Sequence, residues 1–146
     1  MRLSLIQRNQ FLQWRQMRGE VYGSLDDEFH EKEMEQIFAR EDWFCHFLTG
    51  TSNQILGLVE LSSRNIADGC LSSPVAYLEG IYLKKELRGR GLGKEAMGLI
   101  LHWCKEKGYK ELATDSELSN LNAQKYFNAL GFHETFRIVE FCIKVK

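Results

Sequence analysis

The chain has 146 residues, 44% of them hydrophobic and 27% charged, with 20 acidic against 19 basic side chains. This composition excludes wholesale disorder, and the length fits a single domain over residues 1–146 that buries a core without disulfides or metal. A net charge of −1 gives no indication of nucleic-acid binding, and no apolar run approaches the roughly 18 residues that span a membrane. The N-terminus lacks a signal-peptide pattern, so we expect a soluble, cytoplasmic protein.

Hydrophobic periodicity and turn residues predict elements of both kinds. The first part of the chain predicts a strand over 1–7, a helix from 11 that ends at Gly19, and a helix over 26–40. The middle predicts strands over 43–48 and 55–61, joined by a turn, and a continuous apolar strand over 75–83. The remainder predicts helices over 92–107 and 119–130 and strands over 111–114 and 132–145. This order indicates a mixed α/β domain with one sheet and helices on both faces.

Charge is distributed unevenly along the chain. Residues 20–42 carry nine acids against Lys32 and Arg40, whereas residues 84–94 carry five bases against Glu86. Either charged segment can simply be a solvent-exposed surface. Separate acidic and basic segments would also suit an enzyme with two substrates of opposite charge.

The cysteines are scattered and show no paired spacing, which predicts no metal site. We expect them to be mainly small buried side chains in a reducing compartment. They are Cys45, Cys70, Cys104 and Cys142.

A glycine-rich turn between the strand over 75–83 and the following helix carries the strongest chemical signal. It reads Arg88-Gly89-Arg90-Gly91-Leu92-Gly93-Lys94. Glycines let backbone N–H groups approach a ligand, and a helix N-terminus adds positive potential, so the turn predicts a phosphate cradle. A Walker loop fails because Glu95 follows Lys94, and a Rossmann fingerprint fails because the third glycine comes one residue early. The remaining alternative is that the glycines bind no phosphate and serve only the tight turn from the strand to the helix.

The spacing of Arg88, Gly91 and Gly93 resembles the GNAT family of acetyl-CoA-dependent N-acetyltransferases, and the order of elements resembles that family over almost the whole chain. The resemblance implies a GNAT-type domain with a central, mostly antiparallel mixed sheet and acetyl-CoA as co-substrate. It also implies that the backbone of Ile81 and Leu83 pairs with pantetheine and that the turn amides hold the pyrophosphate. The side chain of Asn120 would contact the pantetheine arm.

A longer match narrows the resemblance to the aminoglycoside 6'-N-acetyltransferases. It covers residues 69–81, 113–115 and 129–135, with the run Ser-Ser-Pro-Val-Ala-Tyr-Leu-Glu-Gly at its centre. In that family the glutamate of this run and the aspartate ending the next strand face the acceptor, which implies acceptor-side and catalytic roles for Glu79 and Asp115. Tyr22 is the nearest match to an aromatic acceptor contact, whereas Ile66 and Phe136 depart from the family pattern.

Each acidic candidate also has a structural alternative. Glu79 on an apolar strand needs a partner, and an internal salt bridge to Arg64 or Arg137 would supply one. Asp115 can accept the amine proton directly or through water, but it can equally cap the helix near 119 or form an Asx-turn.

The preferred hypothesis is acetyl transfer to the 6'-amine of an aminoglycoside by direct attack in a ternary complex. Phe127 stands where many family members carry a proton-donating tyrosine. A GNAT enzyme for a polyamine, a peptide N-terminus or lysine is the main alternative, and a non-catalytic CoA-binding module is another. The apolar alternation over 132–145 predicts a homodimer that uses this strand or its neighbour.

Overall fold

One five-stranded sheet organises the first part of the chain in the computed structural model, which describes residues 1–146 as two units, 1–115 and 116–146. The first unit comprises β1 (Arg2–Leu5), α1 (Phe11–Val21), α2 (Asp27–Phe38), β2 (Trp43–Thr49), β3 (Ile55–Arg64), β4 (Val75–Leu83), α3 (Leu92–Glu106) and β5 (Leu112–Thr114), with single 3-10 turns at Arg8–Gln10 and Lys85–Leu87. The second unit contains α4 (Leu121–Ala129). None of the helices is long and apolar enough to cross a membrane.

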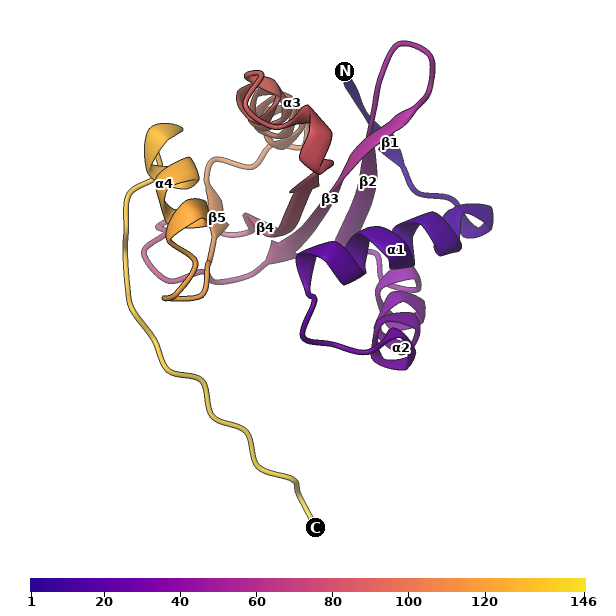
Figure 1. Cartoon of the computed structure of the whole chain (residues 1–146). Coiled ribbons are helices and arrows are strands. Elements are labelled where there is room, and N and C mark those ends of the chain that lie inside the picture. The colour runs from indigo at the N-terminus through magenta and orange to yellow at the C-terminus, as the bar shows by residue number, and fades with distance from the viewer. The chain divides into compact units, whose positions relative to one another are not determined.

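The strands lie in chain order, β1-β2-β3-β4-β5. All neighbouring pairs are antiparallel except β4 and β5, which are parallel and joined through α3 (Figure 1). A parallel neighbour requires a crossover, and α3 is that crossover. The sheet is therefore mixed and mostly antiparallel, as predicted.

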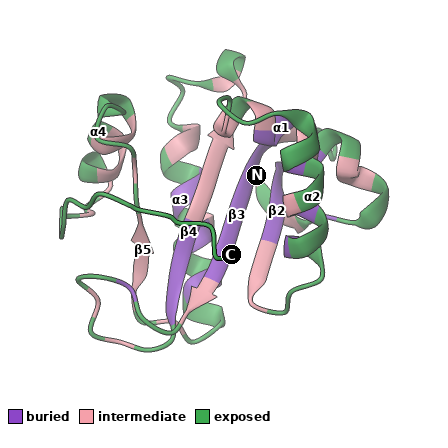
Figure 2. Cartoon of the chain, turned by 90° about the horizontal axis from the view of Figure 1, so that it is seen from below, coloured by how far each residue is buried: buried purple, intermediate pink, exposed green.

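Alternation along β2 assigns the two faces of the sheet. Cys45 and Phe47 pack into a core with Trp14 of α1 and Met34 of α2. The intervening residues point the other way, and the Phe44 ring lies 5.1 Å from the Trp103 ring of α3, centroid to centroid. Helices thus cover both faces, and the most buried residues follow the strands between them (Figure 2).

The helix ends follow local chemistry at α2, where the Asp26 side chain accepts a hydrogen bond from the backbone N–H of Phe29 at 2.8 Å. The prediction that Gly19 ends the first helix is wrong, since α1 continues to Val21. A glycine inside a helix costs only about 1 kcal/mol, and Val21 packs against the core beyond it.

The predicted strand over 132–145 is also wrong for the isolated chain. Residues 132–146 form neither helix nor strand and follow α4 as an extended segment. Strand N–H and C=O groups need a neighbouring strand to pair with, and none pairs with this segment. Its apolar side chains stay exposed, with Phe141 at 92% and Ile143 at 86% of full exposure.

Candidate functional site

Only the first part of β4 pairs with its parallel neighbour, β5. β5 pairs only with Ala76–Leu78, and no strand pairs with the far side of β4 from Glu79 to Leu83. The second half of β4 therefore presents an unpaired edge inside the first unit. An edge of this kind offers backbone groups to an extended ligand.

A bulge at Glu79 decides which backbone groups reach that edge. Opposite β3, Glu60 pairs with Gly80 and Leu61 pairs with Leu78, so Glu79 is the extra residue. Beyond the bulge the Lys84 N–H donates to Leu56 of the strand before it, which directs alternate residues toward β3. The backbone groups of Ile81 and Leu83 point to the open edge instead, and their predicted pairing with pantetheine stays a prediction.

The glycine-rich turn follows that edge directly. Gly89 and Gly91 have φ of 75° and 78°, in the left-handed region that glycine adopts without strain. Gly91 is the N-cap of α3 and supplies no capping side chain, so the helix start is available to an anion. The Arg88 Nε–H donates to the Leu83 carbonyl at 2.9 Å, whereas Arg90 and Lys94 are exposed.

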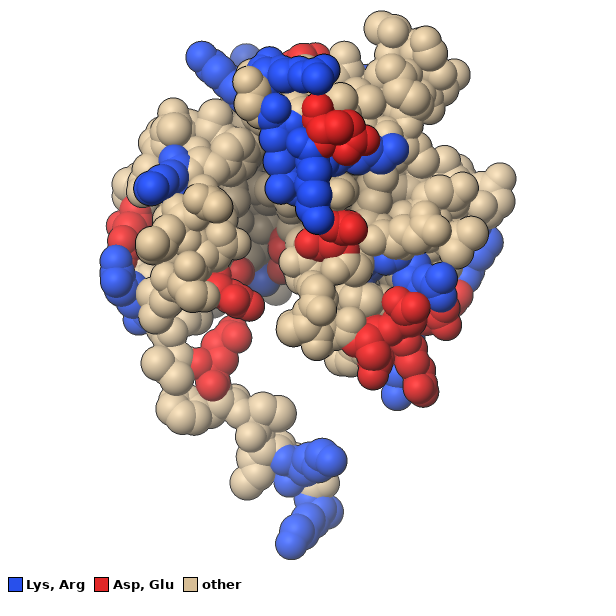
Figure 3. Space-filling view, in the orientation of Figure 1, with Lys and Arg blue, Asp and Glu red and all other residues tan.

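Basic side chains gather on the surface of this turn, apart from the acidic cluster over α2 (Figure 3). The cations come from the segment 84–94, which the sequence already marked as basic. Together with the α3 N-terminus they form a basic surface beside the open edge of β4, where the positive potential would favour an anion.

Glu79 is engaged by three donors. The Arg64 guanidinium donates to both carboxylate oxygens, with Nη2 at 2.9 Å from each and Nε at 3.1 Å from Oε1. The Ser62 hydroxyl also donates to Oε1. The salt bridge to Arg64 is therefore present, whereas Arg137 pairs with Glu134 in the C-terminal segment.

Asp115 accepts a hydrogen bond from the Tyr77 hydroxyl at 2.6 Å. Burial, and then this bond, raise the pKa of Tyr77, so the phenol stays protonated and holds one oxygen of the carboxylate. The alternative that Asp115 caps the next helix is wrong, because Asn120 caps α4. Asp115 is exposed and directly follows β5.

Tyr77 links the two acidic residues. The Arg64 guanidinium carbon lies 3.4 Å from the centre of the Tyr77 ring, so one cation contacts both Glu79 and the tyrosine that holds Asp115. The structure thus brings Glu79 and Asp115 to one cluster on the sheet. Tyr77 was not predicted, and its only sequence signal is its place two residues before Glu79.

A second, buried cluster lies beneath the bulge. Glu60 is 0% and Arg18 2% exposed, and the Arg18 Nη1 lies 2.7 Å from each Glu60 oxygen. The Trp14 indole N–H donates to Glu60 at 2.6 Å, and Glu33 pairs with the same guanidinium from α2. Burial alone would lower the pKa of Arg18, but the charge and hydrogen bonds of Glu60 outweigh it and raise that pKa.

Tyr22 connects this buried cluster to the bulge. Its hydroxyl lies 3.1 Å from Glu60 Oε2 and 3.1 Å from the Glu79 carbonyl oxygen, and burial raises its pKa. A Cβ on Gly80 would lie 2.3 Å from that hydroxyl, so this position requires glycine. The structure places Tyr22 at the end of α1 against the strand that carries Glu79.

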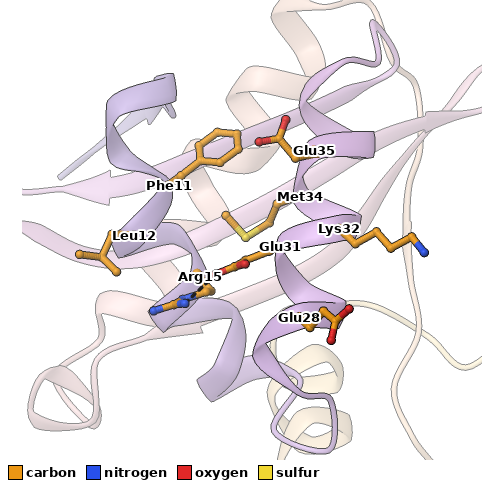
Figure 4. Close-up of a pocket in the computed structure, with 8 residues that line it drawn as sticks. All are labelled: Phe11, Leu12, Arg15, Glu28, Glu31, Lys32, Met34 and Glu35. Atoms are coloured by element: carbon orange, nitrogen blue, oxygen red, sulfur yellow. Dashed lines mark hydrogen bonds and ion pairs between the residues drawn. The ribbon is translucent and has the colours of Figure 1, made fainter.

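Most acidic side chains of the segment 20–42 form ion pairs within the protein. Ion pairs join Glu20 to Lys85, Asp27 and Glu31 to Arg15, Glu33 to Arg18, Glu35 to Arg8, and Asp42 to Arg40. Figure 4 shows Arg15 of α1 reaching Glu31 across the groove between α1 and α2, with Met34 between the helices. The sequence shows the excess of acids in this segment, but it does not show these partners, which neutralise much of the negative charge.

Asn120 belongs to the second unit. Its side-chain oxygen accepts a hydrogen bond from the Ala123 N–H at 3.1 Å, which leaves its amide N–H groups for other partners. The predicted pantetheine contact stays a prediction. The structure holds no cluster of His, Cys, Asp or Glu arranged to bind a metal ion.

Comparison with known proteins gives a consistent result. The model of the acetyltransferase (GNAT) family matches residues 9–132. An aminoglycoside N(6')-acetyltransferase type 1 of Serratia marcescens is 35% identical over 86% of this chain and 87% of its own length.

Two solved structures are similar over nearly their whole length. An apo aminoglycoside 6'-N-acetyltransferase of Acinetobacter haemolyticus superposes with a TM-score of 0.86 at 26% identity, covering 100% of both chains. The enzyme AAC(6')-Iy, bound to the bisubstrate analogue CoA-S-monomethyl-acetylneamine, gives a TM-score of 0.83 at 28% identity over 98% of this chain and 97% of its own. The family match spans the turn, the open edge and both acidic residues, and the chain belongs to the acetyltransferase (GNAT) family.

Proposed function

We propose that residues 1–146 act as one acetyltransferase domain that transfers the acetyl group of acetyl-CoA to the 6'-amine of aminoglycoside antibiotics, a reaction that confers resistance. One observation carries the acceptor assignment. Glu79 and Asp115 converge on the Arg64–Tyr77 pair where β4 separates from β5, so two carboxylates lie beside the open strand edge. Aminoglycosides are polycations, and carboxylates are the groups that would bind and orient their ammonium groups.

The co-substrate fits the chain along β4 and the turn that follows. The backbone of Ile81 and Leu83 would pair with its pantetheine arm, as an added strand does. The amides of the turn at 88–94 would hold the pyrophosphate at the α3 N-terminus, where Gly91 leaves the helix start uncapped. The side chain of Asn120 would contact the arm as well. When bound, acetyl-CoA supplies the thioester carbon that the amine attacks.

Glu79 and Asp115 would have separate roles on the acceptor. Glu79 would bind an ammonium group, and Asp115, with one oxygen held by Tyr77, would accept the proton of the reacting amine directly or through one water. The ring of Tyr22 would contact the acceptor. Phe127 has no proton to donate, so the leaving thiolate would take its proton from solvent.

Cysteine chemistry favours direct attack over an acetyl-enzyme. Burial raises the pKa of Cys45, and burial raises that of Cys104 to about 11, so neither is a thiolate at neutral pH. None of the four cysteines is disulfide-bonded, which also suits the cytoplasm, where we place the protein.

We further propose a homodimer that uses the C-terminal segment. Alternate apolar residues over 132–146 are exposed, and pairing with a strand of a second chain would satisfy their backbone groups. Sedimentation over a range of concentrations should show a dimer. A monomer at every concentration would contradict this assembly.

Thiol release from acetyl-CoA tests the activity directly. The acceptors are a kanamycin-class aminoglycoside, its analogue with a hydroxyl in place of the 6'-amine, spermidine and a lysine peptide. We expect turnover on the first and none on the analogue. Turnover confined to spermidine or to the peptide would overturn the aminoglycoside assignment, and CoA binding without any turnover would favour a non-catalytic module.

A further inference from the structure

The Arg64 guanidinium occupies a site that has the composition of an ammonium-binding pocket. A carboxylate, that of Glu79, contacts it on one side, and the face of the Tyr77 ring lies 3.4 Å from its central carbon on the other. A carboxylate combined with an aromatic face is a favourable environment for an organic cation. The cation present in this structure comes from the chain itself.

The two halves of this arrangement differ in how firmly they are held. Tyr77 is 8% exposed and the Glu79 side chain 14%, and both project from β4, inside the sheet. The Arg64 side chain is 41% exposed and projects from the last residue of β3, where the loop to β4 begins. Rotation about the Arg64 side-chain bonds can remove the cation, whereas the carboxylate and the ring stay in place.

Hydrogen-bond capacity shows that Arg64 and an acceptor ammonium compete. Glu79 Oε1 already accepts from Ser62 and from two Arg64 nitrogens, and Oε2 accepts only from Arg64 Nη2. An ammonium arriving at Oε2 would lie beside a like charge, and it would find neither Oε1 nor the ring face available.

We propose that Arg64 is an internal competitor that fills the ammonium subsite of Glu79 and Tyr77 in the empty enzyme and leaves it when a cationic acceptor binds. The proposal rests on the proposed role of Glu79 toward the acceptor. In the empty enzyme Arg64 neutralises a largely buried carboxylate. A cationic acceptor can replace the charge of Arg64 beside Glu79, whereas a neutral amine cannot. Arg64 would therefore be a specificity-determining residue that favours cationic acceptors.

The test compares Arg64→Met with Arg40→Met. Methionine keeps an unbranched stem over the Tyr77 ring and removes the charge, and Arg40→Met removes the same charge from an exposed pair with Asp42. Initial rates with a kanamycin-class acceptor should show the KM for the acceptor about 5- to 10-fold lower in Arg64→Met. The KM for acetyl-CoA should be unchanged, and Arg40→Met should match the wild type.

Two further measurements make the result specific. Methylguanidinium should compete with the acceptor in Arg64→Met and restore the higher KM, with little effect on the wild type. Arg64→Lys keeps a charge with fewer donors, so its KM for the acceptor should lie between those of the wild type and Arg64→Met. This variant tests the competitor role if the methionine variant does not fold.

A KM that rises or stays constant in the Arg64 variants would overturn the competitor role and indicate that Arg64 positions Glu79 for the acceptor. That result is distinct from failure of the proposed function, which would appear as no aminoglycoside turnover by the wild type.

Discussion

Removing one partner of the buried Arg18–Glu60 pair should strongly destabilise the first unit. Glu60→Gln removes the negative charge and turns an amide N–H₂ toward donors from Trp14, Arg18 and Tyr22. The Arg18 guanidinium, 2% exposed, then retains only Glu33, whose side chain is 37% exposed, as counter-charge. Breaking a buried pair costs about 3–5 kcal/mol, and the surviving Glu33 contact places our expectation near the lower end of that range. At ~2–4 °C per kcal/mol, the melting temperature should fall by about 6–12 °C.

Urea unfolding monitored by circular dichroism measures this loss. The matched control is Glu35→Gln, which removes the same charge from an exposed pair with Arg8 and should change stability by less than about 1 kcal/mol. The double variant Arg18→Met with Glu60→Leu should be more stable than either single variant, because it leaves no unpaired buried charge. A loss below ~1 kcal/mol for Glu60→Gln, with an unchanged urea slope, would refute the assignment of Glu60 as a charge held in the core.

Three further predictions concern the site and the pH response. Gly91→Asp should weaken acetyl-CoA binding by at least ~100-fold in calorimetry, because a carboxylate would stand at the phosphate-binding helix start; retained affinity would contradict the cradle. Asp115→Asn should lower kcat by about 100-fold and leave the KM for acetyl-CoA nearly constant, and an unchanged kcat would remove its role as base. Burial lowers the pKa of His46 below 6.5, so the folded chain disfavours the proton and stability should fall as pH drops below about 6.5. His46→Gln should flatten that decline in pH-dependent urea unfolding, and an unaltered pH profile would assign the decline to other groups.

The sequence predicts the framework well where a single segment contains the whole signal. The strand Val75–Leu83 has the bounds that its apolar run indicated, and the helix after the glycine-rich turn begins at Leu92 as expected. Glycine, capping and periodicity are local properties, so one segment is enough to read them.

Predictions fail where the outcome depends on a distant partner. Residues 132–145 alternate like a strand, but a strand forms only beside another, and no strand of this chain pairs with them. Glu60 shows the same limit for the site. It is a lone acid on an apolar strand, as Glu79 is, yet its partner Arg18 lies 42 residues earlier and no local pattern connects the two.

The bulge at Glu79 explains why the edge proposed for the co-substrate and the carboxylate proposed for the acceptor occur on one strand. Before it, Tyr77 and Glu79 project on one side of the sheet, where Tyr77 packs with Ala67 and Val75; after it, Tyr82 projects on that same side, so the alternation has shifted by one residue. Without the extra residue, the backbone groups at the open edge would be those of Gly80 and Tyr82 in place of Ile81 and Leu83. The hydroxyl of Tyr22, held by buried Glu60, contacts the carbonyl of the extra residue and requires a glycine after it. The buried ionic cluster thus supports the bulge, which leaves a strand edge open for the proposed pairing with acetyl-CoA and carries the carboxylate proposed to bind the amine.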